Sequence, residues 1–132
     1  MNTTYVKRLA LWCFVAIGLS GVVKVSYLQI TGAESCPNIV GLPICYIVTI
    51  GYGLMFLALL LSIPVKHIST PVFLSGWAIT FLIALSGTAL EIINGHACPI
   101  GFGWLPLCYV SLALCILIFG LFKWTQKSAQ VT

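Results

Sequence analysis

The chain has 132 residues, of which 61% are hydrophobic and only 6% are charged, and its mean hydropathy is +1.13. This composition excludes a soluble globular domain, because there are too few polar side chains to cover the surface of one. The net charge of +4 does not indicate a nucleic-acid-binding protein, because the basic residues are spread along the chain instead of being clustered.

Four apolar stretches follow one another along the chain, and each is long enough to cross a hydrocarbon core of about 30 Å at about 1.5 Å per residue. They are connected by two cysteine-containing segments, residues 31–43 and 94–106, and by a short turn at residues 66–70. We therefore expect an all-α integral membrane protein in which residues 1–132 form a single transmembrane domain and the four helices pack as a bundle. The predicted spans are residues 9–30, 44–65, 71–93 and 107–124.

The positively charged residues predict the orientation of these spans. Lys7 and Arg8 precede the first span, Lys66 lies in the middle turn, and Lys123 and Lys127 lie at the end of the last span. Because basic residues concentrate on the cytoplasmic side, both termini and the middle turn should be cytoplasmic, and both cysteine segments should face outward. The small four-span design favours the bacterial inner membrane, where the outward face is the periplasm and disulfides persist.

A motif occurs twice, once in each outward segment. It reads Cys-Pro, then a glycine, then Pro-aliphatic-Cys-Tyr, and it covers residues 36–46 and 98–109. A Leu-Ser-Gly tripeptide precedes each copy. The pattern predicts a tandem repeat of a two-helix unit, with one copy in residues 9–65 and the other in residues 71–124. Because each unit has two spans, both copies would have the same orientation in the membrane.

Four cysteines, Cys36, Cys45, Cys98 and Cys108, lie in these two motifs. The second cysteine of each motif follows a proline that favours the start of a helix, and the amides and dipole of a helix N-terminus stabilise a thiolate. Two such pairs are the minimum for a thiol–disulfide relay, in which one pair oxidises an external thiol and the other passes the electrons on. Alternatively, each pair is a permanent disulfide that fixes its loop to a helix. The sequence leaves the three possible pairings of four cysteines open.

The residues around the second cysteine of each motif resemble known membrane thiol oxidoreductases. Residues 41–53, from Gly-Leu-Pro through Cys45 to Gly-Tyr-Gly, resemble the start of a core helix in the vitamin K epoxide reductase family, and residues 108–113 resemble the end of that family's Cys-x-x-Cys…Ser helix start. Four spans with two outward cysteine segments are also similar to the DsbB type of quinone-linked disulfide oxidase. The resemblance implies oxidation of a thioredoxin-like partner, reduction of a quinone and catalytic roles for the cysteines. Both families carry a Cys-x-x-Cys pair, whereas the cysteines here are separated by eight and nine residues.

Four further residues are candidates for binding the quinone. Lys24 and Glu91 are ionisable side chains within spans, at nearly equivalent positions counted from the Leu-Ser-Gly tripeptides, and such groups are costly in a membrane. We expect them either to form an ion pair beside the ligand or to extend to the membrane interface. Tyr46 and Tyr109 directly follow the helix-borne cysteines, where they would either donate hydrogen bonds to a quinone carbonyl or anchor the helices at the interface.

Three functions fit these features. The first is a thiol–disulfide oxidoreductase that relays electrons from outward thiols, such as those of a thioredoxin-like protein, to a quinone through the two cysteine pairs. The second is a non-enzymatic membrane subunit or assembly partner of a larger complex, whose outer loops are stapled by disulfides. The third is the handling of a soft metal such as copper or mercury. The sequence disfavours this function, because it has no closely spaced Cys-x-x-Cys or methionine clusters. No residue is assigned to a metal site.

Overall fold

The computed structural model describes residues 2–33, 36–62, 66–96, 98, 100–101 and 103–131. In this part of the chain, four long helices account for most of the residues, and each is long and apolar enough to cross a membrane. The predicted four-helix architecture is therefore confirmed at this level. The helices are α1 (Thr3–Ile30), α2 (Ile44–Leu61), α3 (Lys66–Asn94) and α4 (Leu107–Val131).

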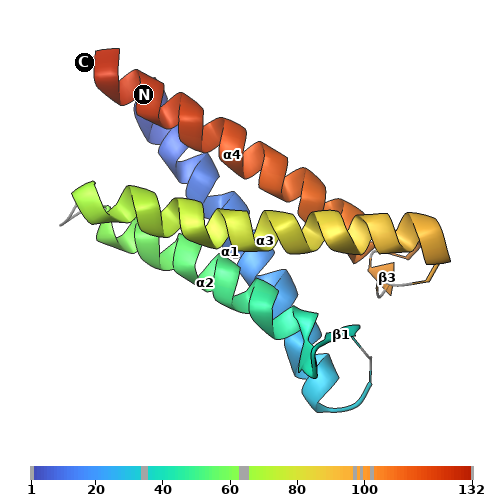
Figure 1. Ribbon diagram of the computed structural model, residues 1–132. Helices are drawn as coiled ribbons and strands as arrows, with labels where there is room; N and C mark the ends of the chain where they lie inside the picture. The colour runs from blue at the N-terminus through green and yellow to red at the C-terminus, as the bar shows by residue number, and fades with distance from the viewer. Residues whose placement is uncertain are drawn as a thin grey trace.

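The four helices pack in a ring, in which α1 and α3 each contact both α2 and α4. Figure 1 shows that both cysteine segments lie at one end of the bundle, while both termini lie at the other end together with the end of α2 and the start of α3. This arrangement follows from the short connections, because each helix must reverse direction relative to the one before it. All four cysteines of the two motifs are consequently brought to the same end of the molecule.

Small residues allow α2 and α3 to approach closely. A Cβ atom added at Gly76 of α3 would lie only 2.6 Å from the backbone oxygen of Gly51 on α2. At Gly51, an added Cβ would overlap the hydroxyl of Thr80, which is buried and donates to the backbone oxygen of Gly76 at 2.9 Å. Close backbone approach at small residues is the usual basis of helix packing in membranes, where the hydrophobic effect does not drive association.

The half of the bundle toward the termini is filled with large side chains. Tyr52, Met55, Phe73, Ile118 and Val15, which come from all four helices, are almost completely buried there. Stacked aromatic rings extend this core between α3 and α4: the ring centroids of Phe73 and Phe122 are 4.2 Å apart, and those of Trp77 and Phe119 are 4.5 Å apart.

Several helix boundaries differ from the prediction. α3 begins at Lys66, so residues 66–70, which we expected to form a turn, are helical and Pro71 lies inside the helix. Pro71 is the sixth residue of α3, so the backbone hydrogen bond that it removes involves only the first turn. α1 and α4 extend beyond their predicted spans toward the termini, and the end of the second predicted span, residues 63–65, lies outside the described residues.

Each cysteine segment contains a short antiparallel hairpin, which the sequence pattern did not predict. In the first, β1 (Asn38–Ile39) pairs with β2 (Leu42–Pro43). In the second, β3 (Ile100–Gly101) pairs with β4 (Leu105–Pro106). A proline ends each hairpin directly before a helix, where its fixed φ and missing N–H cost nothing. The second cysteine of each motif is therefore the second residue of its helix, as predicted.

Candidate functional site

The first hairpin turns at Val40 and Gly41, whose φ angles are +53° and +81°. Positive φ at both central residues is typical of the two-residue type I′ turn, whose twist matches that of the strands. The reversal brings Cys36, which precedes β1, to the start of α2. There it forms a disulfide with Cys45, with the two Cα atoms 6.2 Å apart.

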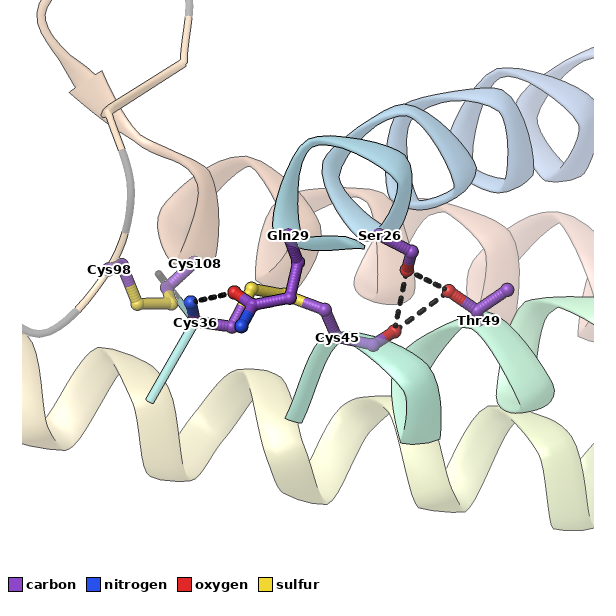
Figure 2. Close-up of a disulfide and its surroundings, with 7 residues drawn as sticks. All are labelled: Ser26, Gln29, Cys36, Cys45, Thr49, Cys98 and Cys108. Atoms are coloured by element: carbon purple, nitrogen blue, oxygen red, sulfur yellow. Dashed lines mark hydrogen bonds between the residues drawn. A yellow bond between two sulfur atoms is a disulfide. The ribbon is translucent and has the colours of Figure 1, made fainter. Parts of the chain in front are cut away.

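Polar side chains at the end of α1 hold both cysteines of this disulfide (Figure 2). The backbone N–H of Cys36 donates to Oε1 of Gln29. The hydroxyls of Ser26 and Thr49 lie 2.9 Å apart, and each also donates to the backbone oxygen of Cys45, at 3.4 Å and 2.7 Å. The disulfide is thus fixed to α1 as well as to its own hairpin and α2.

The second hairpin is closed by a disulfide between Cys98 and Cys108, again with a Cα–Cα distance of 6.2 Å. The backbone N–H of Cys98 donates to Oε2 of Glu91 at 2.9 Å. The sulfur atoms pack against α3 at Gly87, where an added Cβ would lie 2.8 Å from Sγ of Cys108. Glycine at this position allows the disulfide to lie directly on the helix backbone.

The two hairpins are built alike, but their electrostatics differ. In both, the side chain that accepts the hydrogen bond lies seven residues before the cysteine whose amide it binds. By this contact, Glu91 corresponds to Gln29, whereas counting from the tripeptides places it near the position of Lys24. An amide oxygen accepts the bond in the first hairpin and a carboxylate accepts it in the second, so the groups that bind the two cysteine amides differ in charge.

A cavity of about 280 Å³ lies among the four helices at the hairpin end and borders both disulfides. Its wall includes Cys45 of the first pair and both Cys98 and Cys108 of the second. The wall is otherwise mostly aliphatic, and none of the described residues that line the cavity is charged. A partly open apolar space with few polar groups is typical of a site for a small uncharged ligand.

The side chain of Tyr52 forms the floor of this cavity, between the cavity and the packed half of the bundle. Its ring crosses from α2 and lies against Gly18 of α1, where an added Cβ would overlap the ring. Its hydroxyl approaches the side chains of Ser111 and Cys115 on α4. The hydroxyl oxygens of Tyr52 and Ser111 are both buried, and neither forms a hydrogen bond of normal geometry within the described part of the chain.

None of the four residues that we predicted to bind a quinone belongs to the described wall of the cavity. Lys24 is exposed, and Glu91 accepts a hydrogen bond from the backbone N–H of Cys98. Tyr46 and Tyr109 are half-buried and are absent from the described wall of the cavity. The residue after a helix-borne cysteine lies about 100° further around the helix, which turns it away from the site that the cysteine faces.

Tyr52 and Ser111 were not among the predicted site residues, although their positions in the sequence carry a signal. Tyr52 lies between two glycines in the middle of an apolar span, away from the interfaces where tyrosine usually occurs in membrane proteins. Ser111 lies one helical turn after Cys108 and therefore on the same face of α4.

In the part of the chain that the structure describes, no three His, Cys, Asp or Glu side chains are close enough together to hold a metal ion. All four motif cysteines are paired in disulfides, and only a thiolate is a good ligand for a soft metal. The oxidised protein therefore presents no thiolate at this end. No family model, no curated protein and no solved structure matches this chain.

Proposed function

We propose that this protein is an integral membrane thiol–disulfide oxidoreductase that passes electrons from thiols outside the cytoplasm to a quinone. The observation that carries this proposal is that both disulfides border one apolar cavity inside the helix bundle. A disulfide that only stapled a loop would have no need to face such a cavity. The sequence resemblance to the vitamin K epoxide reductase and DsbB-type families points to the same chemistry.

The distribution of charge supports an orientation with the hairpins in the periplasm of a bacterium. Lys7 and Arg8 lie at the end opposite to the hairpins, where they donate to Ser128 and Ser62 at 3.0 Å and 3.2 Å. The Nζ atom of Lys7 also lies 4.1 Å from the ring centroid of Trp124, an arrangement that suits a membrane interface. By the positive-inside rule, this end and both termini are cytoplasmic, and the disulfides lie in an oxidising compartment.

The proposed reaction has three steps: two thiol–disulfide exchanges and then one transfer of two electrons to the quinone. Two thiols of an external protein, which we take to be thioredoxin-like, form a disulfide by reducing Cys36–Cys45 to the dithiol. This dithiol then reduces Cys98–Cys108 by thiol–disulfide exchange and is itself reoxidised. The second dithiol transfers two electrons and two protons to the quinone, which becomes a quinol, and the Cys98–Cys108 disulfide re-forms. We assign the quinone to the second pair because both of its cysteines line the cavity.

The differences between the two hairpins support a relay, because a directional relay needs two unequal pairs. Gln29 accepts the hydrogen bond from the first hairpin and Glu91 accepts the one from the second. A carboxylate beside a cysteine disfavours the thiolate, whereas a neutral amide does not, so the two disulfides would differ in reduction potential. The carboxylate would lower the potential of the second pair, so the driving force for the relay would come from the quinone, which withdraws the electrons from that pair.

The similarities between the hairpins support a duplicated two-helix unit, with copies in residues 9–65 and 71–124. Each copy has a side chain at the end of a helix that binds the amide of the first cysteine, a two-stranded hairpin, and a second cysteine at the start of the next helix. Duplication followed by divergence of a few residues would provide two pairs with the same geometry and different potentials.

The second candidate is a non-enzymatic subunit whose hairpins are stapled for docking onto a larger complex. One observation favours it: Cys36 and Cys98, the first cysteines of the two pairs, are only 5% and 9% exposed. A relay requires one sulfur of the first pair to be reached by an external thiolate, and the half-buried Cys45 would have to serve.

The test is the redox state of each pair in isolated membranes, measured by differential alkylation and peptide mapping during titration with a dithiol and then with a quinone. We expect both pairs to be reduced by the dithiol and reoxidised when the quinone is added. Cys45→Ser should abolish oxidation of an external dithiol, while Cys13→Ser, which changes an exposed free cysteine outside both hairpins, should leave it unchanged. If both pairs stay oxidised under these conditions, the disulfides are staples and the second candidate is correct.

A further inference from the structure

Two residues that line the cavity, Tyr52 and Ser111, carry buried hydroxyls that form no hydrogen bond of normal geometry within the described part of the chain. Tyr52 is only 1% exposed. An unpaired hydroxyl costs free energy when it is buried, and phenylalanine or alanine at these positions would avoid that cost. Such groups in a folded protein call for an explanation, and a ligand that accepts hydrogen bonds is one.

The two residues place their hydroxyls close together on one side of a mostly apolar space. Tyr52 lies seven residues after Cys45, or about 10 Å along α2, and its ring crosses the bundle to bring the hydroxyl to α4. Ser111 lies one turn after Cys108 on α4. The two hydroxyls are therefore on the side of the cavity away from the hairpins, while the disulfides border the opposite side.

We propose that the cavity binds a single uncharged ring that carries a carbonyl oxygen, and that this oxygen accepts hydrogen bonds from Tyr52 and Ser111. The described wall contains no charged side chain, which excludes the recognition of an ionic ligand by a counter-charge. This proposal deepens the proposed function, because it places one quinone carbonyl at the two hydroxyls and the other side of the ring toward the disulfides. A hydroxyl both donates and accepts, so the same two groups would also accept hydrogen bonds from the quinol.

A volume of about 280 Å³ accommodates a substituted ring but not a long isoprenoid chain as well. The chain must therefore leave the cavity, and α1 offers the route. Ile17, Ser20 and Gly21 line the cavity and are also exposed at the surface of the bundle. An added Cβ at Gly21 would meet no atom within 4 Å, so there is space beside α1 at this point.

The test uses decylubiquinone, a short-chain benzoquinone, and the full-length oxidised protein in detergent, with binding followed by quenching of tryptophan fluorescence. We expect Tyr52→Phe and Ser111→Ala each to weaken the affinity about three- to tenfold, as the loss of one hydrogen bond does. Tyr52→Phe should unfold at the same temperature as the wild type or at a higher one, because it removes a buried unpaired hydroxyl. Tyr46→Phe, the same chemical change outside the described wall of the cavity, should bind normally.

A second pair of variants tests the route without touching the hydroxyls. Gly21→Leu should obstruct the cavity beside α1 and weaken binding at least tenfold, whereas Gly120→Leu, at an exposed glycine with the same free space, should have no effect. The inference is overturned if decylubiquinone does not bind the wild type, or if it binds Tyr52→Phe, Ser111→Ala and Gly21→Leu as tightly as the wild type.

The outcomes for the inference and for the proposed function are distinguishable. Binding that depends on Tyr52 with disulfides that never turn over would support the ring site and refute the oxidoreductase. Turnover with a Michaelis constant for the quinone that is unchanged in Tyr52→Phe would support the oxidoreductase and refute the ring site.

Discussion

Gly87 is the position where the smallest possible substitution should change the chemistry of one disulfide and spare the other. In Gly87→Ala the new Cβ would lie 2.8 Å from Sγ of Cys108, which is 0.6 Å less than the 3.4 Å at which ordinary contacts begin, and 3.5 Å from Sγ of Cys98. The disulfide must therefore move away from α3. In the dithiol form the Cys108 side chain is free to rotate, so the strain falls mainly on the oxidised protein.

Inserting a methyl group into a packed site costs about 1 to 3 kcal/mol. Since about 1.4 kcal/mol corresponds to about 30 mV for a two-electron couple, the reduction potential of Cys98–Cys108 should rise by about 20 to 60 mV. A destabilised disulfide is easier to reduce, which gives the positive sign. Alanine also has a higher helix propensity than glycine, by about 1 kcal/mol, but this gain is equal in both redox states and does not change the potential.

The assay is equilibration of the purified protein in dithiol redox buffers, followed by alkylation and peptide mapping of each pair. The Cys36–Cys45 pair is an internal control, because the residue that corresponds to Gly87 in the first half is Val25, four residues before Gln29, and it is unchanged. Gly53→Ala is a matched control, because its added Cβ meets no atom within 4 Å. An unchanged potential for Cys98–Cys108, or an equal shift of both pairs, would refute the reasoning.

Two further predictions concern the hairpins. Val40 is 97% exposed and has a φ of +53°, which is a strained conformation for a β-branched residue. Val40→Asn creates an Asn-Gly type I′ turn and should stabilise the first hairpin by about 1 kcal/mol. Hydrogen–deuterium exchange of that hairpin should slow about fivefold, and unchanged exchange would contradict the assigned turn. Glu91→Gln should keep the Cys98 amide protected from exchange, since Gln29 shows that an amide oxygen is sufficient in the same geometry. Glu91→Ala removes the acceptor, and the protection of this amide should fall by about 1 to 2 kcal/mol. Equal exchange in the two Glu91 variants would show that the hydrogen bond does not hold the hairpin.

The local features of this protein were predictable because they depend on neighbouring residues. Four apolar stretches of sufficient length predict four helices, and a proline directly before an aliphatic residue and a cysteine predicts that the cysteine begins a helix. The same local reasoning is wrong at residues 66–70, because it predicts a turn there and a helix that begins at Pro71. In the structure, α3 begins at Lys66 and includes Pro71. Both hairpins were also missed, since strands of two residues are too short to show an alternating pattern.

The pairing of the cysteines and the position of the cavity depend on packing between distant residues, and only the tertiary structure decided them. The sequence allowed three pairings, and the structure selects the two within the hairpins because each turn brings the Cα atoms to 6.2 Å. It also shows that Glu91 accepts a hydrogen bond from the backbone N–H of Cys98, and that Tyr52 and Ser111 line the cavity whereas Tyr46 and Tyr109 are absent from its described wall. The face of a helix that meets a cavity is set by the rotation and depth of all four helices, and no local pattern in one helix specifies that relation.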